Sequence, residues 1–317
     1  MKVVDLIKKA KRPLFTFELV PPLKGNSIES INATIERLLK YDPAYINITN
    51  HQSHIMYVER EDGVIERKLI RKRPGTIGLS AAIQYRYKVP VVPHLICGGN
   101  TKEQIEDQLV ELNFLGIENI LALRGDPSSI EKRFTPTEGG HAYSDELVKQ
   151  IADTNKGMYL DPTLREPLAT NFCVGVAGYP EKHLEAPNLE YDIAMLKQKV
   201  EAGAEYIVTQ MFFINDYYFS FVEKCRDAGI HVPIIPGIKP IQRKRDLELL
   251  PQTFKVDLPS HLVSDITQSS SVQEVREIGI DFCITQVKEL LSKGVPGVHF
   301  YTQGRGEPVA QVVEATF

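Results

Sequence analysis

Residues 191–238 have the sequence YDIAMLKQKVEAGAEYIVTQMFFINDYYFSFVEKCRDAGIHVPIIPGI. Helical periodicity runs from Tyr191 to Ala202 and stops at glycine 203, and a second helix-like segment begins at Asn215. Runs rich in β-branched and aromatic residues follow these segments at Tyr206–Phe213 and Val232–Ile238. Both runs are mostly apolar on their two faces, as strands of a helix-covered parallel sheet are. The stretch therefore predicts alternating helices and parallel strands.

The same alternation extends along the whole chain. Eight strand-like runs occur, at Phe15–Val20, Tyr45–Thr49, Val91–Cys97, Ile120–Arg124, Phe172–Ala177, Tyr206–Phe213, Val232–Ile238 and Val298–Tyr301. Eight strand–helix units predict an α/β fold, a single (β/α)8 TIM barrel in which residues 1–317 form one catalytic domain. The competing open doubly wound sheet normally carries a glycine-rich dinucleotide loop, and neither GxGxxG nor GxxxxGK[ST] occurs here.

Two connections are too long for simple crossovers. Residues 50–90, after strand two, contain Asp62-Gly63 between short apolar runs, which predicts a small hairpin. Residues 155–171, before strand five, are rich in turn-forming residues. These insertions either cover the mouth of the barrel or decorate its surface.

Composition excludes several classes of protein. A formal net charge of -4 gives no broad basic surface for nucleic acid, and no apolar run is long enough to cross a membrane. The four cysteines form no CxxC pair or disulfide framework, and the first residues, MKVVDLIKKAKRP, lack the apolar core of a signal peptide. We therefore expect a cytoplasmic protein. His51 and His54 have an HxxH spacing without a further ligand cluster, so no metal site is expected.

Polar side chains collect where the predicted strands end, which is where barrel enzymes place their chemistry. They are Glu18, Thr49, His94, Arg124, Asp126, Tyr179, Gln210 and Arg305. Glu18 lies among apolar residues, and burial of this kind raises a carboxyl pKa toward the range of a general acid. The alternative for Glu18 is a carboxylate paired with a buried Arg or Lys.

The other strand ends allow more than one interpretation. Arg124 and Asp126 flank a glycine and either contact a ligand or pair with each other to hold their loop. His94 is a general base, a ligand contact or a hydrogen-bonded core histidine. Lys199 lies on a predicted helix, where an anion contact is possible and a Schiff base is not expected.

Seven short motifs of this chain occur in the same order as in a known protein family. They are Phe17–Pro22, Pro93–Leu95, Leu123–Asp126, Tyr179–Glu181, Lys199–Ala204, Thr209–Phe213 and His299–Thr302. With these motifs the chain resembles the methylenetetrahydrofolate reductase family, flavoproteins that make methyltetrahydrofolate for methionine synthesis. The resemblance implies a barrel with non-covalent FAD across its strand ends, and NADH or NADPH as co-substrate.

The resemblance also implies roles for individual residues. Glu18 and Asp126 match catalytic positions, and the same two residues match folate contacts together with Gln210 and Arg305. Contacts to FAD or nicotinamide are implied for Thr49, His94, Arg124, Gly125, Asp126, Tyr143, Tyr179, His183, Ala186, Asp192 and Lys199. The basic run at residues 242–246 either attracts the glutamate tail of folate or forms a solvated helix start.

The implied reaction is a ping-pong hydride transfer from NAD(P)H to methylenetetrahydrofolate through the flavin, in a homo-oligomer. Three alternatives remain: a relative that takes electrons from a protein donor, a non-flavin barrel such as a lyase or aldolase, and a folate-binding protein without activity.

Overall fold

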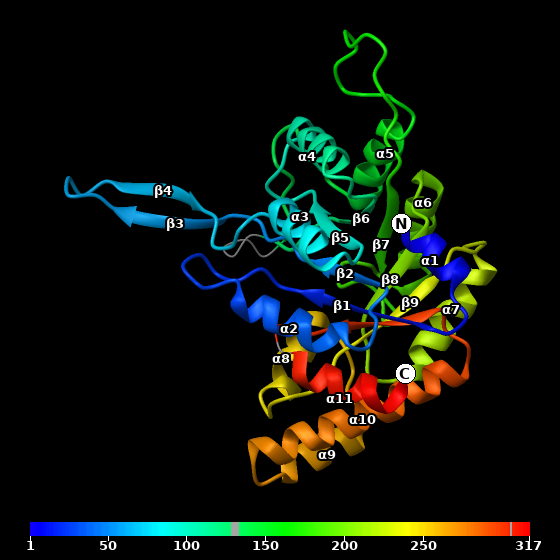
Figure 1. Ribbon diagram of the computed structural model, residues 1–317. Coiled ribbons are helices and arrows are strands. Elements are labelled where there is room, and N and C mark those ends of the chain that lie inside the picture. The colour runs from blue at the N-terminus through cyan, green and yellow to red at the C-terminus, as the bar shows by residue number, and fades with distance from the viewer. Residues whose placement is uncertain (128–132, 305) are drawn as a thin grey trace.

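A closed barrel of eight parallel strands forms the centre of the computed structural model, which describes residues 1–127, 133–304 and 306–317 (Figure 1). Its order is β1-β10-β9-β8-β7-β6-β5-β2, and β1 pairs with β2 to close the ring. The strands are β1 (Leu14–Leu19), β2 (Tyr45–Ile48), β5 (Val91–Ile96), β6 (Asn119–Leu123), β7 (Cys173–Gly178), β8 (Tyr206–Met211), β9 (Ile234–Ile238) and β10 (Gly297–Tyr301). All eight predicted strands and the predicted α/β TIM barrel are confirmed.

Helices follow the barrel strands and pack against their outer faces (Figure 1). They are α2 (Glu29–Leu39), α3 (Thr76–Tyr87), α4 (Lys102–Phe114), α5 (Ser144–Thr154), α6 (Leu189–Ala202), α7 (Asn215–Asp227), α10 (Val272–Ser292) and α11 (Gly306–Thr316), with α8 (Asp246–Phe254) and α9 (Ser260–Gln268) inserted before α10. The start of α4 shows how local sequence sets a boundary. The Thr101 hydroxyl accepts from the Gln104 N–H and the Gln104 side chain accepts from the Thr101 N–H, which forms a capping box.

The short helix α1 (Val3–Lys9) closes the amino end of the barrel. Val3 and Val4 pack on the buried rings of Tyr45 and Tyr206, and the Val3 N–H donates to Asn119 Oδ1 at 2.8 Å. Because this end is filled by apolar side chains, polar chemistry is left to the carboxyl ends of the strands.

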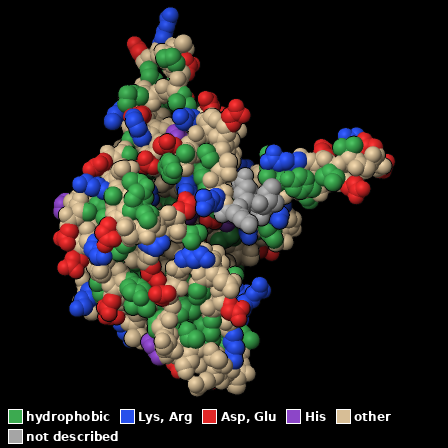
Figure 2. Space-filling view, turned by 180° about the vertical axis from the view of Figure 1, so that it is seen from behind, with side chains coloured by type: hydrophobic (Ala, Val, Ile, Leu, Met, Phe, Trp, Pro, Cys, Tyr) green, Lys and Arg blue, Asp and Glu red, His purple; other side chains and the backbone are tan. Residues whose placement is uncertain are grey.

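The insertion after β2 contains the predicted hairpin. Strands β3 (His54–Glu59) and β4 (Ile65–Ile70) pair antiparallel and project away from the barrel as an arm (Figure 1). Met56, Tyr57 and Leu69 are exposed on the arm, whose surface shows both apolar and charged side chains (Figure 2). The tip of the arm does not cover the barrel mouth, and only the segments at its base reach the strand ends.

The second insertion lies at the other end of the barrel from the strand carboxyl ends. Residues 155–171 follow α5, which returns the chain to the amino side, and lead directly into the amino end of β7. Asn155 Oδ1 accepts from the Phe172 N–H at 2.8 Å and from the Thr170 hydroxyl at 2.7 Å, which fixes the insertion to that strand. The prediction that it could cover the mouth is therefore wrong.

No helix within the described residues combines the length and the apolar character needed to span a bilayer.

Candidate active site

Glu18 lies near the carboxyl end of β1 with its side chain 13% exposed. Burial raises its pKa to about 8. Its Oε2 atom lies 3.9 Å from Nε2 of His94, on β5, and burial, together with His299 and His51, lowers the pKa of His94 to about 3. At neutral pH the carboxyl is therefore protonated and the imidazole uncharged, so the two groups form no ion pair.

The alternative interpretation of Glu18 required a buried Arg or Lys beside it. Within residues 1–127, 133–304 and 306–317, no Lys or Arg nitrogen lies within 4 Å of this carboxyl; the contact found is the one to His94. Without a cation, a charged carboxylate at this depth is disfavoured. The surroundings of Glu18 therefore favour the protonated, uncharged form of its carboxyl.

Two further polar residues, Asn47 and His299, belong to the same cluster. Asn47 Nδ2 lies 3.3 Å from His94 Nε2, and His299 Nδ1 lies 2.6 Å from the Thr16 hydroxyl. All of these side chains are buried. Sequence reasoning missed Asn47 and His299, although a polar residue inside an otherwise apolar strand was the available signal.

Gly237, near the end of β9, lies where its neighbours leave no room for a side chain. A Cβ atom on Gly237 would lie 2.2 Å from the backbone oxygen of Thr209 and 2.6 Å from the Tyr301 ring. The Tyr301 hydroxyl donates to the Thr209 carbonyl at 2.7 Å across this glycine. Only a residue without a side chain fits between the two neighbouring strands here.

Arg124, at the end of β6, is held by a partner that the sequence did not indicate. Its Nη1 donates to Glu185 Oε2 at 2.6 Å, and its guanidinium lies over the Phe134 ring. The predicted alternative, a pair with Asp126, is not the one formed. Asp126 is exposed, and its backbone oxygen accepts from the Gln52 amide at the base of the arm.

A second cation lies near Arg124 on the adjacent strand–helix unit. Lys199 Nζ, on α6, is 3.5 Å from the Ala177 carbonyl. Burial lowers the pKa of Lys199, the carboxylate of Asp192 opposes this change, and Arg124 adds to it. Asp192 in turn accepts from the His183 N–H at 2.8 Å, and the His183 ring packs edge-on against Tyr179.

The remaining predicted site residues are less closely connected. Thr49 Oγ1 lies 3.2 Å from His51 Nε2, and Gln210 Oε1 accepts from the Met211 N–H. Ala186 is buried. Tyr143, the residue that precedes α5 in the sequence, is 60% exposed. Gly125 has a φ of +88°, a conformation that favours glycine. Arg305 lies outside the described residues.

The raised pKa of Glu18 predicts a pH dependence of folding. The carboxyl titrates near 4.5 in the unfolded chain and near 8 in the fold. Between these values the unfolded state releases a proton that the folded state keeps, so the stability present below pH 4.5 is lost as the pH rises. Urea unfolding of wild type and Glu18→Gln measures this effect. Between about pH 5 and about pH 9 we expect the free energy of unfolding of wild type to fall by on the order of a few kcal/mol relative to that of Glu18→Gln. A stability difference that does not change with pH would contradict this assignment.

Comparison with known proteins places this arrangement in a family. The model of the methylenetetrahydrofolate reductase family matches residues 2–316. The chain belongs to the methylenetetrahydrofolate reductase family. The 5,10-methylenetetrahydrofolate reductase of Pectobacterium carotovorum is 30% identical over 295 residues, which cover 92% of this chain and 86% of that protein.

Larger relatives match over part of their length. Methylenetetrahydrofolate reductase (NADH) 1 of Arabidopsis thaliana is 32% identical over 315 residues, 95% of this chain and 48% of that protein. The chain thus spans about half the length of the eukaryotic relatives that it matches. A solved structure from Clostridium thermocellum, described as binding two copies of 5-methyl-5,6,7,8-tetrahydrofolic acid, superposes with a TM-score of 0.59 at 16% identity, over 99% of this chain and 96% of that one. This likeness supports the fold.

Within the part of the chain that the structure describes, no three His, Cys, Asp or Glu side chains are grouped so as to hold a metal ion.

Proposed function

We propose that this chain reduces 5,10-methylenetetrahydrofolate to 5-methyltetrahydrofolate with NADH or NADPH, using non-covalently bound FAD in a single catalytic domain. The observation that carries the proposal is the buried Glu18 carboxyl at the strand ends, which lies 3.9 Å from His94 and, among the described residues, has no Lys or Arg nitrogen within 4 Å. Burial raises its pKa to about 8, which favours a carboxyl that holds its proton at neutral pH. Opening the imidazolidine ring of the folate requires a proton at a ring nitrogen, and a general acid supplies it best when its pKa lies near the working pH.

The residues present fit FAD by the chemistry of their side chains. Arg124 and Lys199 provide two neighbouring cations for a pyrophosphate, and Gly125 leaves room for close approach of a ligand. Thr49, His94, Tyr179 and His183 add hydroxyl and ring groups at adjacent strand ends. When bound, FAD would supply the hydride chemistry that connects the two substrates.

The side chains of the chain would then control protons and orientation. Glu18 would deliver its proton to the folate, and the carboxylate left behind would recover a proton readily because its buried position disfavours charge. Asp126 and Gln210 would orient the pterin, with Arg305 near the tail. Because one set of strand ends would serve both substrates, we expect ping-pong kinetics.

The coenzyme remains either NADH or NADPH in this proposal. Relatives carry both names: the Arabidopsis protein is an NADH enzyme, and a Caenorhabditis elegans protein with 27% identity is a probable NADPH enzyme. The proposal extends to a homo-oligomer in the cytoplasm. All four cysteines are free and buried, which is consistent with a reducing compartment.

Lys199→Met should weaken retention of FAD about 10-fold or more, because it removes a desolvated cation from the proposed pyrophosphate site. Equilibrium dialysis of FAD measures the effect directly. Lys197→Met is the matched control on the same helix, because Lys197 is exposed and pairs only weakly with Glu201 at 3.9 Å. Equal FAD affinity in the two variants would remove Lys199 from the site.

A further inference from the structure

A pocket of about 710 Å³ lies between the start of α7, the helix α9 and the helix α10, next to the carboxyl end of β8. Helices α9 and α10 lie side by side and form two of its walls (Figure 1). Its apolar lining includes the buried Phe213 and Leu262 and the half-buried Ile278 and Phe282. A volume of this size with a mainly apolar lining is typical of sites for small molecules.

Three carboxylates also line the pocket: Asp265 on α9, and Asp281 and Glu289 on α10. All three residues are exposed, and among the described residues no Lys or Arg nitrogen lies within 4 Å of any of these carboxylates. The part of the lining that the structure describes contains no Lys or Arg. The protein therefore leaves the negative charge of this pocket without a neighbouring cation.

The carboxylates lie at two separate ends of the pocket. Asp281 and Glu289 are on one face of α10, two turns apart, which separates them by about 12 Å along the helix. A short connection joins α9 to α10, so the two helices run antiparallel, and the His261 ring on α9 packs against the Phe282 ring on α10. Asp265, one turn beyond His261, therefore lies on the Asp281 side of the pocket.

The Glu289 end of the pocket contains a buried acceptor without a donor. Asn215 is only 8% exposed and lines the pocket; its Nδ2 donates to Glu289 Oε2 at 2.6 Å and to the Gln286 carbonyl at 3.1 Å. The buried Oδ1 of Asn215 has no hydrogen-bond partner among the described residues. Because an unpaired buried acceptor is costly, a ligand N–H that reaches this oxygen would stabilise the site.

The amino ends of α7 and α9 also border the pocket, and they oppose part of its negative charge. Each helix start contributes about half a positive charge. Against three carboxylates this leaves about two negative charges, which a dication neutralises and a monocation does not. Anions such as folates and NAD(P)H are repelled by the same charge, so the pocket serves neither proposed substrate.

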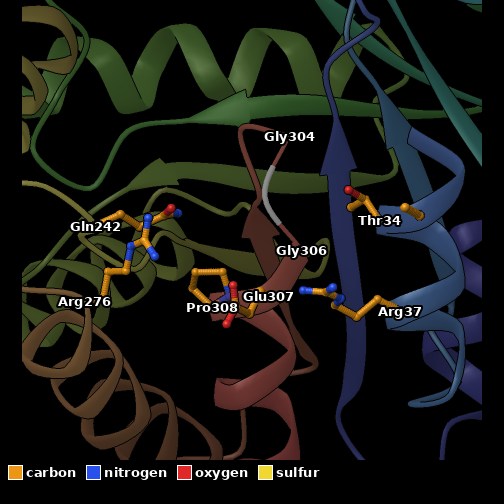
Figure 3. A pocket seen from close by; sticks show the side chains of 9 residues that line it. Thr34, Arg37, Gln242, Arg276, Gly304, Gly306, Glu307 and Pro308 are labelled. Atoms are coloured by element: carbon orange, nitrogen blue, oxygen red, sulfur yellow. The ribbon is translucent and has the colours of Figure 1, made fainter. Parts of the chain in front are cut away.

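The opposite face of α10 carries the opposite charge. Figure 3 shows Arg276 of this helix beside Gln242 at a smaller cavity of about 270 Å³, with Arg37 on its other side. Asp281 and Glu289 follow the four-residue spacing of a single helix face, whereas Arg276 falls on the other side of the helix. The negative charge is therefore a property of the pocket and not of α10 as a whole.

We propose that this pocket binds a linear aliphatic diamine lengthwise along α10. One ammonium lies beside Asp265 and Asp281, and the other lies beside Glu289 and the free acceptor of Asn215. An ammonium has three N–H donors, enough for both the carboxylate and the amide oxygen. The methylene chain between the two ammoniums covers the apolar lining and removes it from water. This inference goes beyond the proposed function and does not rest on it.

Isothermal titration calorimetry of the full chain with diaminooctane, diaminobutane and octylamine tests the proposal. Diaminooctane, whose spacer separates its ammoniums about as far as Asp281 lies from Glu289, should bind about 5-fold more tightly, or better, than each of the other two. Diaminobutane is too short to reach both ends, and octylamine has a single ammonium. Asp281→Asn should lower the affinity for diaminooctane to that for octylamine, whereas Asp107→Asn, at an exposed position of α4, should keep the preference.

A tryptophan placed in the pocket shows where the diamine binds. The chain contains no tryptophan, so the emission of a Phe282→Trp protein reports on the pocket alone. Diaminooctane should change this emission with the Kd found by calorimetry, and it should not change the emission of Phe114→Trp, at an exposed position of α4.

Three results would overturn the proposal. They are equal or absent binding of the three amines to wild type, a preference kept by a folded Asp281→Asn protein, and binding that leaves the emission of Phe282→Trp unchanged. Because these experiments measure binding and not reduction, they give the same answer whether or not the chain has the proposed reductase activity.

Discussion

Glu18→Gln should retain FAD and oxidise NADH with an artificial acceptor at the wild-type rate, while folate reduction falls about 10²- to 10⁴-fold. Glutamine matches the neutral, buried carboxyl in shape, but its amide protons are not acidic enough to be transferred to the folate nitrogen. The carboxyl that it replaces holds its proton up to about pH 8 and faces an uncharged His94. Stopped-flow measurement of each half-reaction separates the two effects.

The matched control for this variant is Glu201→Gln, since Glu201 is exposed on α6 and makes one weak surface pair. It should leave both half-reactions unchanged. Comparable loss of both half-reactions in a folded, flavin-loaded Glu18→Gln protein would show that Glu18 is not the acid on the folate side.

Gly279→Ala should destabilise the fold by about 3 kcal/mol or more, although alanine is the better helix former by about 1 kcal/mol. Gly279 lies within α10, where a Cβ atom would be 2.0 Å from the backbone oxygen of Ile241. That backbone belongs to the loop after β9, so the helix or the loop would have to shift. Urea unfolding of both proteins gives the difference in free energy.

Gly78→Ala provides the comparison, because Gly78 also lies in a helix, α3, and a Cβ atom there meets nothing within 4 Å. This change should leave stability unchanged or raise it by about 0.5 kcal/mol. If Gly279→Ala behaved like Gly78→Ala, the close packing of α10 on the loop after β9 would be wrong.

The barrel could be predicted from the sequence because each of its parts leaves a local pattern. Strands such as β8 are apolar on both faces, helices such as α4 carry their own capping residues, and Gly203 stops α6. The position of residues 155–171 left no such pattern. The end of the barrel that this loop occupies follows from the order of the elements, because it comes after α5 and before β7, and the helical segments predicted from the sequence did not include α5.

The sequence predicted which residues form the candidate site better than it predicted which of them contact each other. The sequence indicated Glu18 and His94 separately, and their 3.9 Å contact depends on the ring order of the barrel. Arg124 was expected beside Asp126, yet it pairs with Glu185, which a later loop brings from 61 residues away. Contacts between loops of different strands are set by three-dimensional closure and not by spacing along the chain.

An anaerobic titration of the purified protein tests the central claim most directly. The flavin spectrum is recorded, NADH or NADPH is added, and methylenetetrahydrofolate follows after the excess coenzyme has been removed. We predict a bound flavin that bleaches with the coenzyme and is reoxidised by the folate. A protein that binds no FAD on reconstitution, or a flavin reduced by neither coenzyme, would contradict the account, and the second result would indicate a protein electron donor.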